Sequence, residues 1–138
     1  PVPRPRKVSA GSETILLVED EDAVRGLVRQ MLQENGYTLL EANGATQALL
    51  LAERYAKPIH LMLTDVIMPQ MSGPELATHL APMHPETKVL YMSGYTDDAL
   101  AQHGLPDSQA TYLQKPFTPN TLAEKLRGLL GTLPPAPA

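Results

Sequence analysis

The sequence predicts an α/β domain in which a five-stranded parallel sheet is covered by helices on both faces. Short apolar runs alternate along the chain with longer segments whose apolar residues have helical spacing. The apolar runs lack polar alternation, which is typical of strands buried on both faces of a parallel sheet. The chain has 138 residues, the size of one domain, and 43% of them are hydrophobic, enough to form a core.

Five short segments are the expected strands. They are residues 15–18, 37–40, 61–63, 89–92 and 111–113, of which the second and the fifth are the weaker. Strands that alternate with helices form parallel sheets with right-handed crossovers. Since the carboxyl ends of such strands meet at one edge, where ligands bind, we expect functional residues directly after the strands.

Two longer helices are expected in the first half of the chain. The first has apolar residues at i, i+3, i+4, i+7 and i+8, followed by the stop signal Asn35-Gly36. Those apolar residues are Val24, Leu27, Val28, Met31 and Leu32. A second, broader stripe occupies residues 48–55, and Pro58 ends it.

Three further helices are expected after the third strand. Two short ones are predicted at residues 74–81 and at about 97–103. In the last, Thr118 is the cap and Pro119 takes the first helical position, where its missing N–H costs nothing. The buried face of this helix is expected to comprise Leu122, Leu126, Leu129 and Leu130, with Gly131 closing it.

The two ends of the chain differ from its middle in composition. Six of the 14 prolines fall there: Pro1, Pro3, Pro5, Pro134, Pro135 and Pro137. Such segments favour extended chain, so the domain is expected at residues 13–131, with a linker or tail at 1–12 and a Pro/Ala tail at 132–138. Because the chain begins with Pro instead of Met, we expect a fragment of a longer protein or a processed product.

The composition excludes several classes of function. The net charge of −4 argues against nucleic-acid binding, and no apolar run approaches the length that a transmembrane helix needs. No signal-peptide pattern opens the chain. Without cysteine there is no disulfide, thiolate metal site or cysteine nucleophile, which fits a reducing compartment. We therefore expect a cytoplasmic domain that contacts neither nucleic acid nor membrane.

Polar side chains follow four of the predicted strands. Residues 19–22, Glu-Asp-Glu-Asp, follow the first, and Asp65, Ser93 and Lys115 follow the third, fourth and fifth. Carboxylates held together repel unless a cation lies among them, and Mg²⁺ needs only one or two carboxylates with waters and a phosphate. A lysine opposite them can pair with an added anion. The pattern predicts a site for a phosphoryl group and Mg²⁺, with a carboxylate as candidate nucleophile.

Each of these residues also has a structural interpretation when it is taken alone. The acids at 19–22 suit the N-terminus of the next helix, Asp65 and Ser93 suit turns, and Lys115 suits a solvated loop. Their joint occurrence at strand ends, in this order, favours the phosphoryl site.

Four separated motifs resemble the receiver domain of two-component response regulators. They are ILLVEDE at residues 15–21, LMLTDVIMPQMSG at 61–73, VLYMSGYT at 89–96 and YLQKPF at 112–117. The resemblance covers the core from about Thr14 to Leu130. It implies a (βα)5 flavodoxin-like receiver fold and a role in phosphorelay signal transduction.

The resemblance also implies a role for each site residue. Asp65 looks like the phosphoacceptor, which takes its phosphoryl group from a phosphohistidine of a partner kinase. Glu19 and Asp20 look like the acidic pair that holds Mg²⁺, with Asp65 and the backbone carbonyl of Ile67 completing the protein ligands. The receiver is then a phosphoacceptor that catalyses its own phosphotransfer and dephosphorylation.

The resemblance assigns Ser93 and Tyr112 to a switch and Lys115 to the phosphate. Ser93 looks like the hydroxyl that moves to a phosphoryl oxygen, and Tyr112 like the aromatic ring that turns inward with it. Lys115 looks like the lysine that pairs with the phosphate, and the Lys115–Pro116 bond is expected to be cis.

The lifetime of the acyl phosphate can also be predicted. Ile67 and Tyr95 lie two residues after Asp65 and Ser93, and neither carries a group suited to orient an attacking water. We therefore expect an acyl phosphate that lasts minutes or more.

Several other polar or bulky residues receive structural interpretations. Tyr91 and Met62 are expected to pack in the core. The histidines are His60, His79, His84 and His103, which show no ligand spacing. They are expected at the surface or its boundary, and none is a candidate phosphodonor.

The sequence disfavours three alternatives to a phosphoacceptor. A metal-dependent phosphatase or hydrolase usually has a second acid two residues beyond its nucleophile, whereas Asp65 is followed by Val66 and Ile67. The same absence disfavours a nucleic-acid-cleaving fold. A degenerate receiver that only binds a partner is disfavoured because all the chemical residues are present.

The context of the domain has two interpretations. It is a stand-alone regulator or the receiver of a hybrid sensor histidine kinase. The sequences of residues 91–98 and 113–117 resemble receivers attached to hybrid kinases and favour the second interpretation. The expected partners are a sensor histidine kinase or its phosphohistidine domain, and a downstream signalling protein. Whether phosphorylation produces a dimer is left open.

Overall fold

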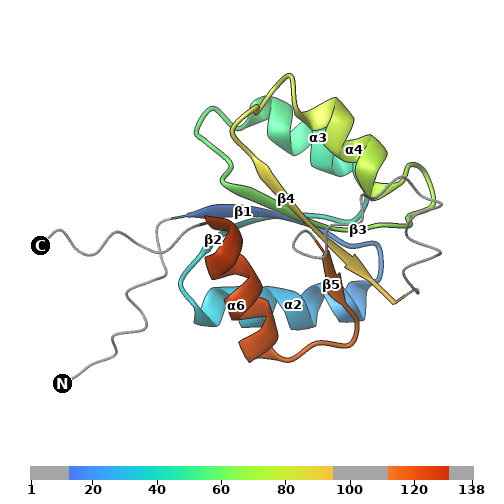
Figure 1. Ribbon diagram of the computed structural model, residues 1–138. Helices are drawn as coiled ribbons and strands as arrows, with labels where there is room; N and C mark the ends of the chain where they lie inside the picture. Colours follow the sequence, from blue (N-terminus) through green and yellow to red (C-terminus); the bar gives the residue numbers. More distant parts are fainter. Residues whose placement is uncertain (1–12, 95–111, 131–138) are drawn as a thin grey trace, which may run out of the picture.

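The structure is a computed structural model that describes residues 13–94 and 112–130. These residues form five strands and four helices, labelled in Figure 1. The elements are β1 (Thr14–Val18), α2 (Asp22–Glu34), β2 (Thr38–Ala42), α3 (Ala45–Arg54), β3 (Leu61–Asp65), α4 (Gly73–Leu80), β4 (Lys88–Ser93), β5 (Tyr112–Gln114) and α6 (Pro119–Leu130). All five predicted strands are therefore present.

The sheet is parallel throughout, and its strand order is β2-β1-β3-β4-β5. β1 pairs with β2 on one side and with β3 on the other, so the strand order reverses at β1. In open α/β sheets, ligands bind outside the carboxyl ends of the strands at such a switch point. The residues that follow β1 and end β3 are thus placed beside each other at the edge where a site is expected.

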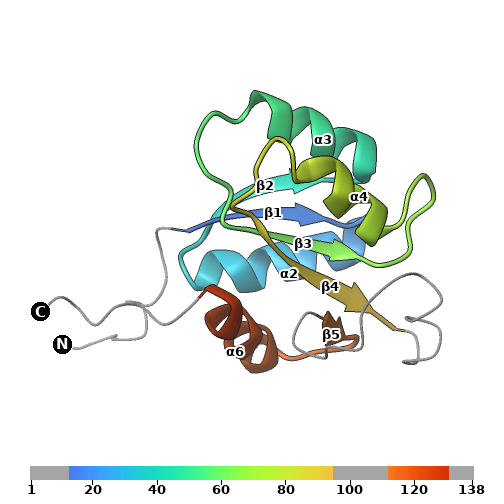
Figure 2. The same ribbon diagram turned by 45° about the horizontal axis from the view of Figure 1, so that its top comes forward.

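Helices cover both faces of the sheet, as the sequence predicts. Helices α2 and α6 lie on one face and α3 and α4 on the other (Figures 1 and 2). The side chains of β1 alternate between the two layers: Ile15 and Leu17 pack with α2 and α6, whereas Leu16 and Val18 pack with α3 and α4. Every residue of β1 is buried, which explains why this strand shows no polar alternation.

Local signals in the sequence determine most helix ends. Gly36, just after α2, has a φ of 86°, in the left-handed region that favours glycine. The N–H of Thr121 donates to Thr118 Oγ1 at 3.1 Å, so Thr118 caps α6 as predicted. Ser72 and Glu75 form a reciprocal capping box at the start of α4. None of the helices in the described ranges combines the length and apolar character that crossing a bilayer requires.

Some element boundaries differ from the prediction. β2 begins at Thr38 instead of residue 37, because the N–H of Tyr37 closes the turn after α2 on the Leu32 carbonyl at 3.3 Å. β3 continues through the buried Thr64 to Asp65, and the Thr64 hydroxyl donates to the Asp65 carbonyl at 3.1 Å. The helix expected at about 97–103 and the closing Gly131 lie outside the described residues.

The interpretation of Tyr91 and Met62 as core residues is confirmed, since both are buried. The interpretation of His84 as a surface or boundary residue is wrong: only 7% of it is exposed. Its Nε2 lies 2.8 Å from the Ala52 carbonyl, near the end of α3, and its Nδ1 lies 3.0 Å from Glu86 Oε2. His84 is buried because it satisfies a helix carbonyl that would otherwise lack a partner.

Candidate functional site

The polar residues predicted at strand ends lie together at the carboxyl edge of the sheet. Glu19 follows β1, Asp65 ends β3, Ser93 ends β4 and Lys115 follows β5. Glu19, Asp65 and Ser93 are buried, with exposed fractions of 0%, 6% and 3%. Buried polar groups need partners, so this cluster must be held by specific contacts.

Lys115 is the cation of the cluster. Its Nζ lies 2.7 Å from Asp65 Oδ1 and 3.1 Å from Glu19 Oε1. Burial alone would lower the pKa of Lys115, but the hydrogen bond and charge of Asp65, with those of Glu19, raise its pKa above the usual value. The ammonium group is therefore charged and directed at both carboxylates.

Glu19, Asp20 and Asp65 form an acidic cluster in which one oxygen of each carboxylate lies within 4.8 Å of the others. Burial, together with the neighbouring Glu19, raises the pKa of Asp65 to about 8. For Glu19, burial is outweighed by hydrogen bonds from Asp65, the Glu21 N–H and Lys115, so its pKa is lowered. Three carboxylates thus lie close together, two of them in contact with one ammonium group, and the oxygen donors fit a hard divalent cation such as Mg²⁺.

Glu19 is fixed by contacts at several atoms. Its N–H donates to the Ala42 carbonyl of β2 at 3.1 Å, and its Oε2 accepts the N–H of Glu21 at 3.1 Å. Glu21 is the N-cap residue of α2, so a Glu19 oxygen also serves that helix end. The alternative interpretation of the acids at 19–22 as helix caps therefore holds in part for Glu19, in addition to its place in the cluster.

The end of β4 is tied to the segment that carries the lysine. The backbone N–H of Lys115 donates to the Ser93 carbonyl at 2.7 Å, and Ser93 is in register with Gln114. The Lys115–Pro116 peptide bond is cis, as expected. Ser93 therefore lies between the strand that ends in Asp65 and the lysine that contacts it.

The remaining predicted positions surround this cluster. Tyr112 is half-buried and packs against Val66 and Tyr91. Ile67 follows in the loop after β3 and is 36% exposed. What its backbone carbonyl binds stays a prediction, and Tyr95 lies outside the described residues.

Gly73 contributes to the site although its role was not visible in the sequence. A Cβ at this position would overlap the backbone carbonyl of Asp65 and come within 3.1 Å of the Tyr91 ring. The N–H of Gly73 donates to the Val66 carbonyl at 2.7 Å. Only glycine allows the start of α4 to approach the end of β3 so closely.

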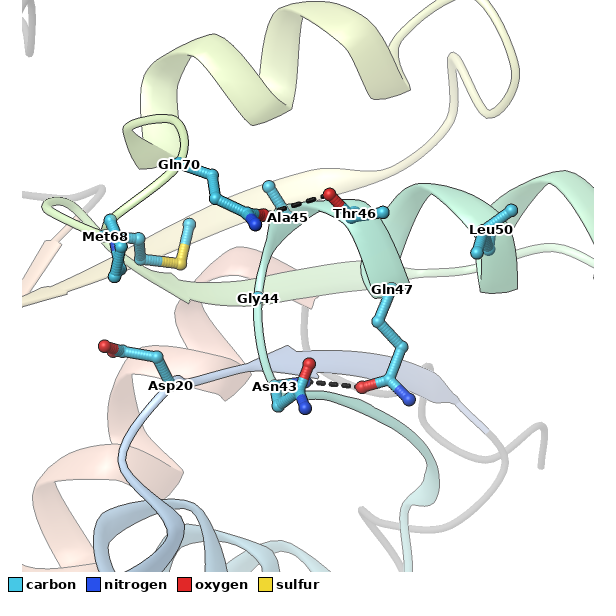
Figure 3. A pocket seen from close by; sticks show the side chains of 10 residues that line it. Asp20, Asn43, Gly44, Ala45, Thr46, Gln47, Leu50, Met68 and Gln70 are labelled. Atoms are coloured by element: carbon cyan, nitrogen blue, oxygen red, sulfur yellow. Dashed lines mark hydrogen bonds between the residues drawn. The ribbon is translucent and has the colours of Figure 1, made fainter.

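A cavity of about 460 Å³ borders the acidic cluster at Asp20 (Figure 3). It lies between the loop before α3 and the loop after β3. Two hydrogen bonds in its wall are drawn there: the Asn43 N–H donates to Gln47 Oε1 at 2.7 Å, and Thr46 Oγ1 donates to Gln70 Oε1 at 2.9 Å. The cluster is thus accessible on the side of Asp20, while Glu19 and Asp65 are buried.

Comparison with known proteins agrees with this geometry. Residues 15–127 match the family described as response regulator receiver domain. The sensor kinase CckA of Brucella abortus (strain 2308) is 40% identical over 121 residues, which make up 88% of this chain and 13% of that protein. The receiver protein CpdR of the same organism is 32% identical over 84% of this chain and 95% of CpdR.

Solved structures give the same result. The receiver domain of a hybrid histidine kinase CckA is 37% identical with a TM-score of 0.71, covering 86% of this chain and 99% of that one. A CheY-like receiver domain protein from Methanospirillum hungatei JF-1 is 29% identical with a TM-score of 0.74, covering 86% of this chain and 93% of that one. This chain therefore belongs to the response regulator receiver domain family of two-component signalling.

Proposed function

We propose that this receiver domain accepts a phosphoryl group on Asp65 from a phosphohistidine and then changes conformation to control a partner. The observation that carries the proposal is the 2.7 Å contact between Lys115 Nζ and Asp65 Oδ1 inside a buried acidic cluster. A cation there can offset the charge of an arriving phosphoryl group.

Asp65 is a better acceptor than the other two acids. Both oxygens of Glu19 already have partners, since Oε2 accepts the Glu21 N–H and Oε1 faces Lys115. Asp20 is exposed, beside the open cavity. Asp65 ends the central strand β3, where the Thr64 hydroxyl donates to its backbone carbonyl. A nucleophile must be held in one position to attack in line.

The transfer replaces one phosphorus bond by another. A carboxylate oxygen of Asp65 forms a bond to phosphorus while the P–N bond of the phosphohistidine breaks, and the electron pair returns to the imidazole nitrogen of the donor. Lys115 offsets charge on the transferred group. We propose Glu19, Asp20 and Asp65, with the Ile67 carbonyl, as the ligands of Mg²⁺, which supplies further charge neutralisation when bound.

The switch is the second part of the proposal. Phosphorylation adds about two negative charges near pH 7 next to the end of β4. A conformation in which the Ser93 hydroxyl donates to a phosphoryl oxygen is then favoured, with Tyr112 following into the space beside Val66 and Tyr91. Partners would bind the surface that this movement changes.

The relatives support a proposal for the partners. CckA is named a sensor kinase and a hybrid histidine kinase, and this chain spans 13% of it. We propose a histidine kinase or its phosphohistidine domain as phosphodonor and a hybrid kinase as the origin of the domain. A stand-alone regulator is the alternative, since this chain spans 95% of CpdR. The cytoplasmic location stays a prediction.

Acetyl phosphate with Mg²⁺, followed by intact-mass measurement, tests the proposal. The native domain is expected to gain one phosphoryl group, and Asp65→Asn none. Equal uptake by both proteins would exclude Asp65 as the acceptor. No uptake by the native domain, from acetyl phosphate or from a phosphorylated histidine kinase, would favour a receiver that only binds its partner.

A further inference from the structure

We infer that Arg25 is a positioning residue for the acidic pair: it holds the backbone carbonyl of Glu19 and thereby aims the carboxylate of Asp20 at the cation. This inference rests on the proposed function, because it concerns the same Mg²⁺ site. Arg25 lies in the first turn of α2, and its residue type alone does not indicate this role.

The guanidinium of Arg25 folds back over the turn between β1 and α2. Nη1 donates to the Glu19 carbonyl at 2.8 Å, and Nη2 donates to Asp22 Oδ1 at 2.7 Å. Nε lies 3.6 Å from Glu41 Oε1 on β2. Only 18% of the Arg25 side chain is exposed. Because the planar guanidinium group has several partners at once, it is held in one orientation. We call this side chain, with its contacts to Glu19, Asp22 and Glu41, the Arg25 brace.

The brace acts on Asp20 through the peptide bond. The carbonyl of Glu19 and the N–H of Asp20 belong to one planar unit, so fixing the first fixes the second and the direction of the Asp20 Cα. On the other side, the N–H of Glu19 is held by the Ala42 carbonyl at 3.1 Å. The backbone on either side of Glu19 is thus fixed, and the direction of Asp20 follows from it.

Two neighbouring residues of β2 hold Arg25 and the backbone of Glu19 in place. Glu41 faces Arg25, and the adjacent Ala42 accepts the Glu19 N–H. Glu41 is shared with Arg29, whose Nη1 donates to it at 3.1 Å. Arg29 therefore has the same charge, the same helix and the same acidic partner as Arg25, but the contact to the Glu19 carbonyl is made by Arg25. This makes Arg29 a matched control.

Removing Arg25 is expected to change the Mg²⁺ affinity in opposite directions, depending on whether Arg25 acts through its charge or by positioning the backbone. If the guanidinium acted only through its charge, its removal would make the site more negative and Mg²⁺ would bind more tightly. If it acts by position, its removal frees the peptide unit before Asp20 and Mg²⁺ binds more weakly. Groups that orient metal ligands typically contribute a factor of about ten or more to metal affinity.

The test is a titration of the native domain, Arg25→Ala, Arg25→Lys and Arg29→Ala with Mg²⁺ alone, followed by amide chemical shifts. We expect Arg25→Ala to bind Mg²⁺ about tenfold more weakly and Arg29→Ala to bind like the native domain. Arg25→Lys keeps the charge but lacks the fork, so it is expected to resemble Arg25→Ala. If Arg25→Ala does not fold, the Mg²⁺ affinity of Arg25→Lys is compared with those of the native domain and Arg29→Ala instead.

Phosphorylation by acetyl phosphate provides a second measurement. In Arg25→Ala the Mg²⁺ concentration for half-maximal rate is expected to rise about tenfold, while the rate at saturating Mg²⁺ changes by less than about twofold. Unchanged or tighter Mg²⁺ binding by Arg25→Ala, native-like binding by Arg25→Lys, or equal weakening by Arg29→Ala would overturn the inference. If the native domain itself bound no Mg²⁺, the proposed function would fail instead.

Discussion

Lys115 joins the ends of two strands that are not neighbours in the sheet. Its Nζ lies 2.7 Å from Asp65 Oδ1 on β3, although β4 lies between β3 and β5. The lysine thus passes over the end of β4, where its own N–H is bonded to the Ser93 carbonyl. Three adjacent strands therefore bring Asp65, Ser93 and Lys115 together at one edge of the sheet.

Replacing Lys115 by Ala is expected to slow phosphorylation by acetyl phosphate about a hundredfold, because one preorganised cation at the transferred group is lost. It also leaves Glu19 and Asp65 facing each other without their ammonium partner. Since 26% of the lysine side chain is exposed, the cost in stability is expected to be about 1–2 kcal/mol, below that of a fully buried pair. Rates and urea unfolding measure both effects. Lys57→Ala, at an exposed loop position, is the control, and an equal loss there would contradict the prediction.

Asp65→Asn is expected to raise the stability of the domain in a chelator by about 1 kcal/mol at neutral pH, because it removes a buried carboxylate that faces Glu19. The same variant removes one of three carboxylates from the acidic cluster. Added Mg²⁺ is therefore expected to raise the melting temperature of the native domain and to have little effect on the variant. Melting curves with and without Mg²⁺ provide the measurement, and an equal Mg²⁺ response in both proteins would count against the assigned ligands.

Gly73→Ala is expected to destabilise the domain by about 1–3 kcal/mol and to impair phosphorylation, because the new Cβ overlaps the Asp65 carbonyl. Gly128→Ala in α6 is the matched control. Apart from its chain neighbours and the adjacent backbone of α6, no atom lies within 4 Å of the Cβ it would add, and alanine favours a helix. That variant is expected to gain about 0.5–1 kcal/mol. Chemical unfolding measures the free energy of unfolding of both variants. Similar changes for the two substitutions would contradict the close approach of Gly73 to the Asp65 carbonyl.

Ile67→Asn is expected to shorten the lifetime of the acyl phosphate. Ile67 is partly exposed in the loop after Asp65, and asparagine there offers a polar group to an attacking water. Ile67→Val, which stays apolar, is expected to resemble the native domain. Loss of phosphate from the phosphorylated proteins is followed by mass, and an unchanged or slower rate in Ile67→Asn would disprove the explanation.

Glu86→Gln is expected to destabilise the domain at neutral pH and not in acid. The pKa of Glu86 is held below its usual value by its own backbone N–H, by His84 and by the N–H of Ile59. A lowered folded-state pKa stabilises the fold above the unfolded pKa, and this contribution disappears as the pH falls through the folded value. Because Glu86 is exposed, the difference at pH 7 is expected to stay below about 1 kcal/mol.

Urea unfolding at neutral pH and below about pH 4 measures the effect of Glu86→Gln. The two proteins are expected to converge in acid. Glu53→Gln is the control, because Glu53 is another exposed acid, on α3, and lines a second cavity together with His84 and Glu86. A difference that persisted unchanged in acid would show that the carboxylate charge is not responsible.

The candidate site could be predicted because topology turns sequence order into proximity. Glu19, Asp65 and Lys115 are far apart in the chain, but each lies at the carboxyl end of a parallel strand, and these ends meet at one edge. The strand signal itself came from apolar runs such as 15–18, whose residues are all buried. The apolar pattern of the strands and the position of each residue at a strand end were enough to predict that Glu19, Asp65 and Lys115 lie together.

Other contacts could not be predicted, because they depend on where a long side chain turns. Arg25 is a polar residue on an amphipathic helix, and nothing in the spacing indicates that it returns to a carbonyl six residues earlier. His84 is buried because the end of α3 lies above it, which depends on tertiary packing. The contact of Gly73 with the Asp65 carbonyl likewise depends on how α4 packs.

The position of β2 at the edge of the described sheet has a consequence for local opening. An edge strand is paired on one side, so it separates at a lower free energy than β3, which is paired on both. When β2 separates, the contact of Ala42 with Glu19 and that of Glu41 with Arg25 are lost, while Asp65 and Lys115 keep their contact. Binding of the proposed Mg²⁺ is therefore expected to slow hydrogen exchange along β2, and fraying of this strand is expected to weaken that binding without disturbing the contact between Asp65 and Lys115.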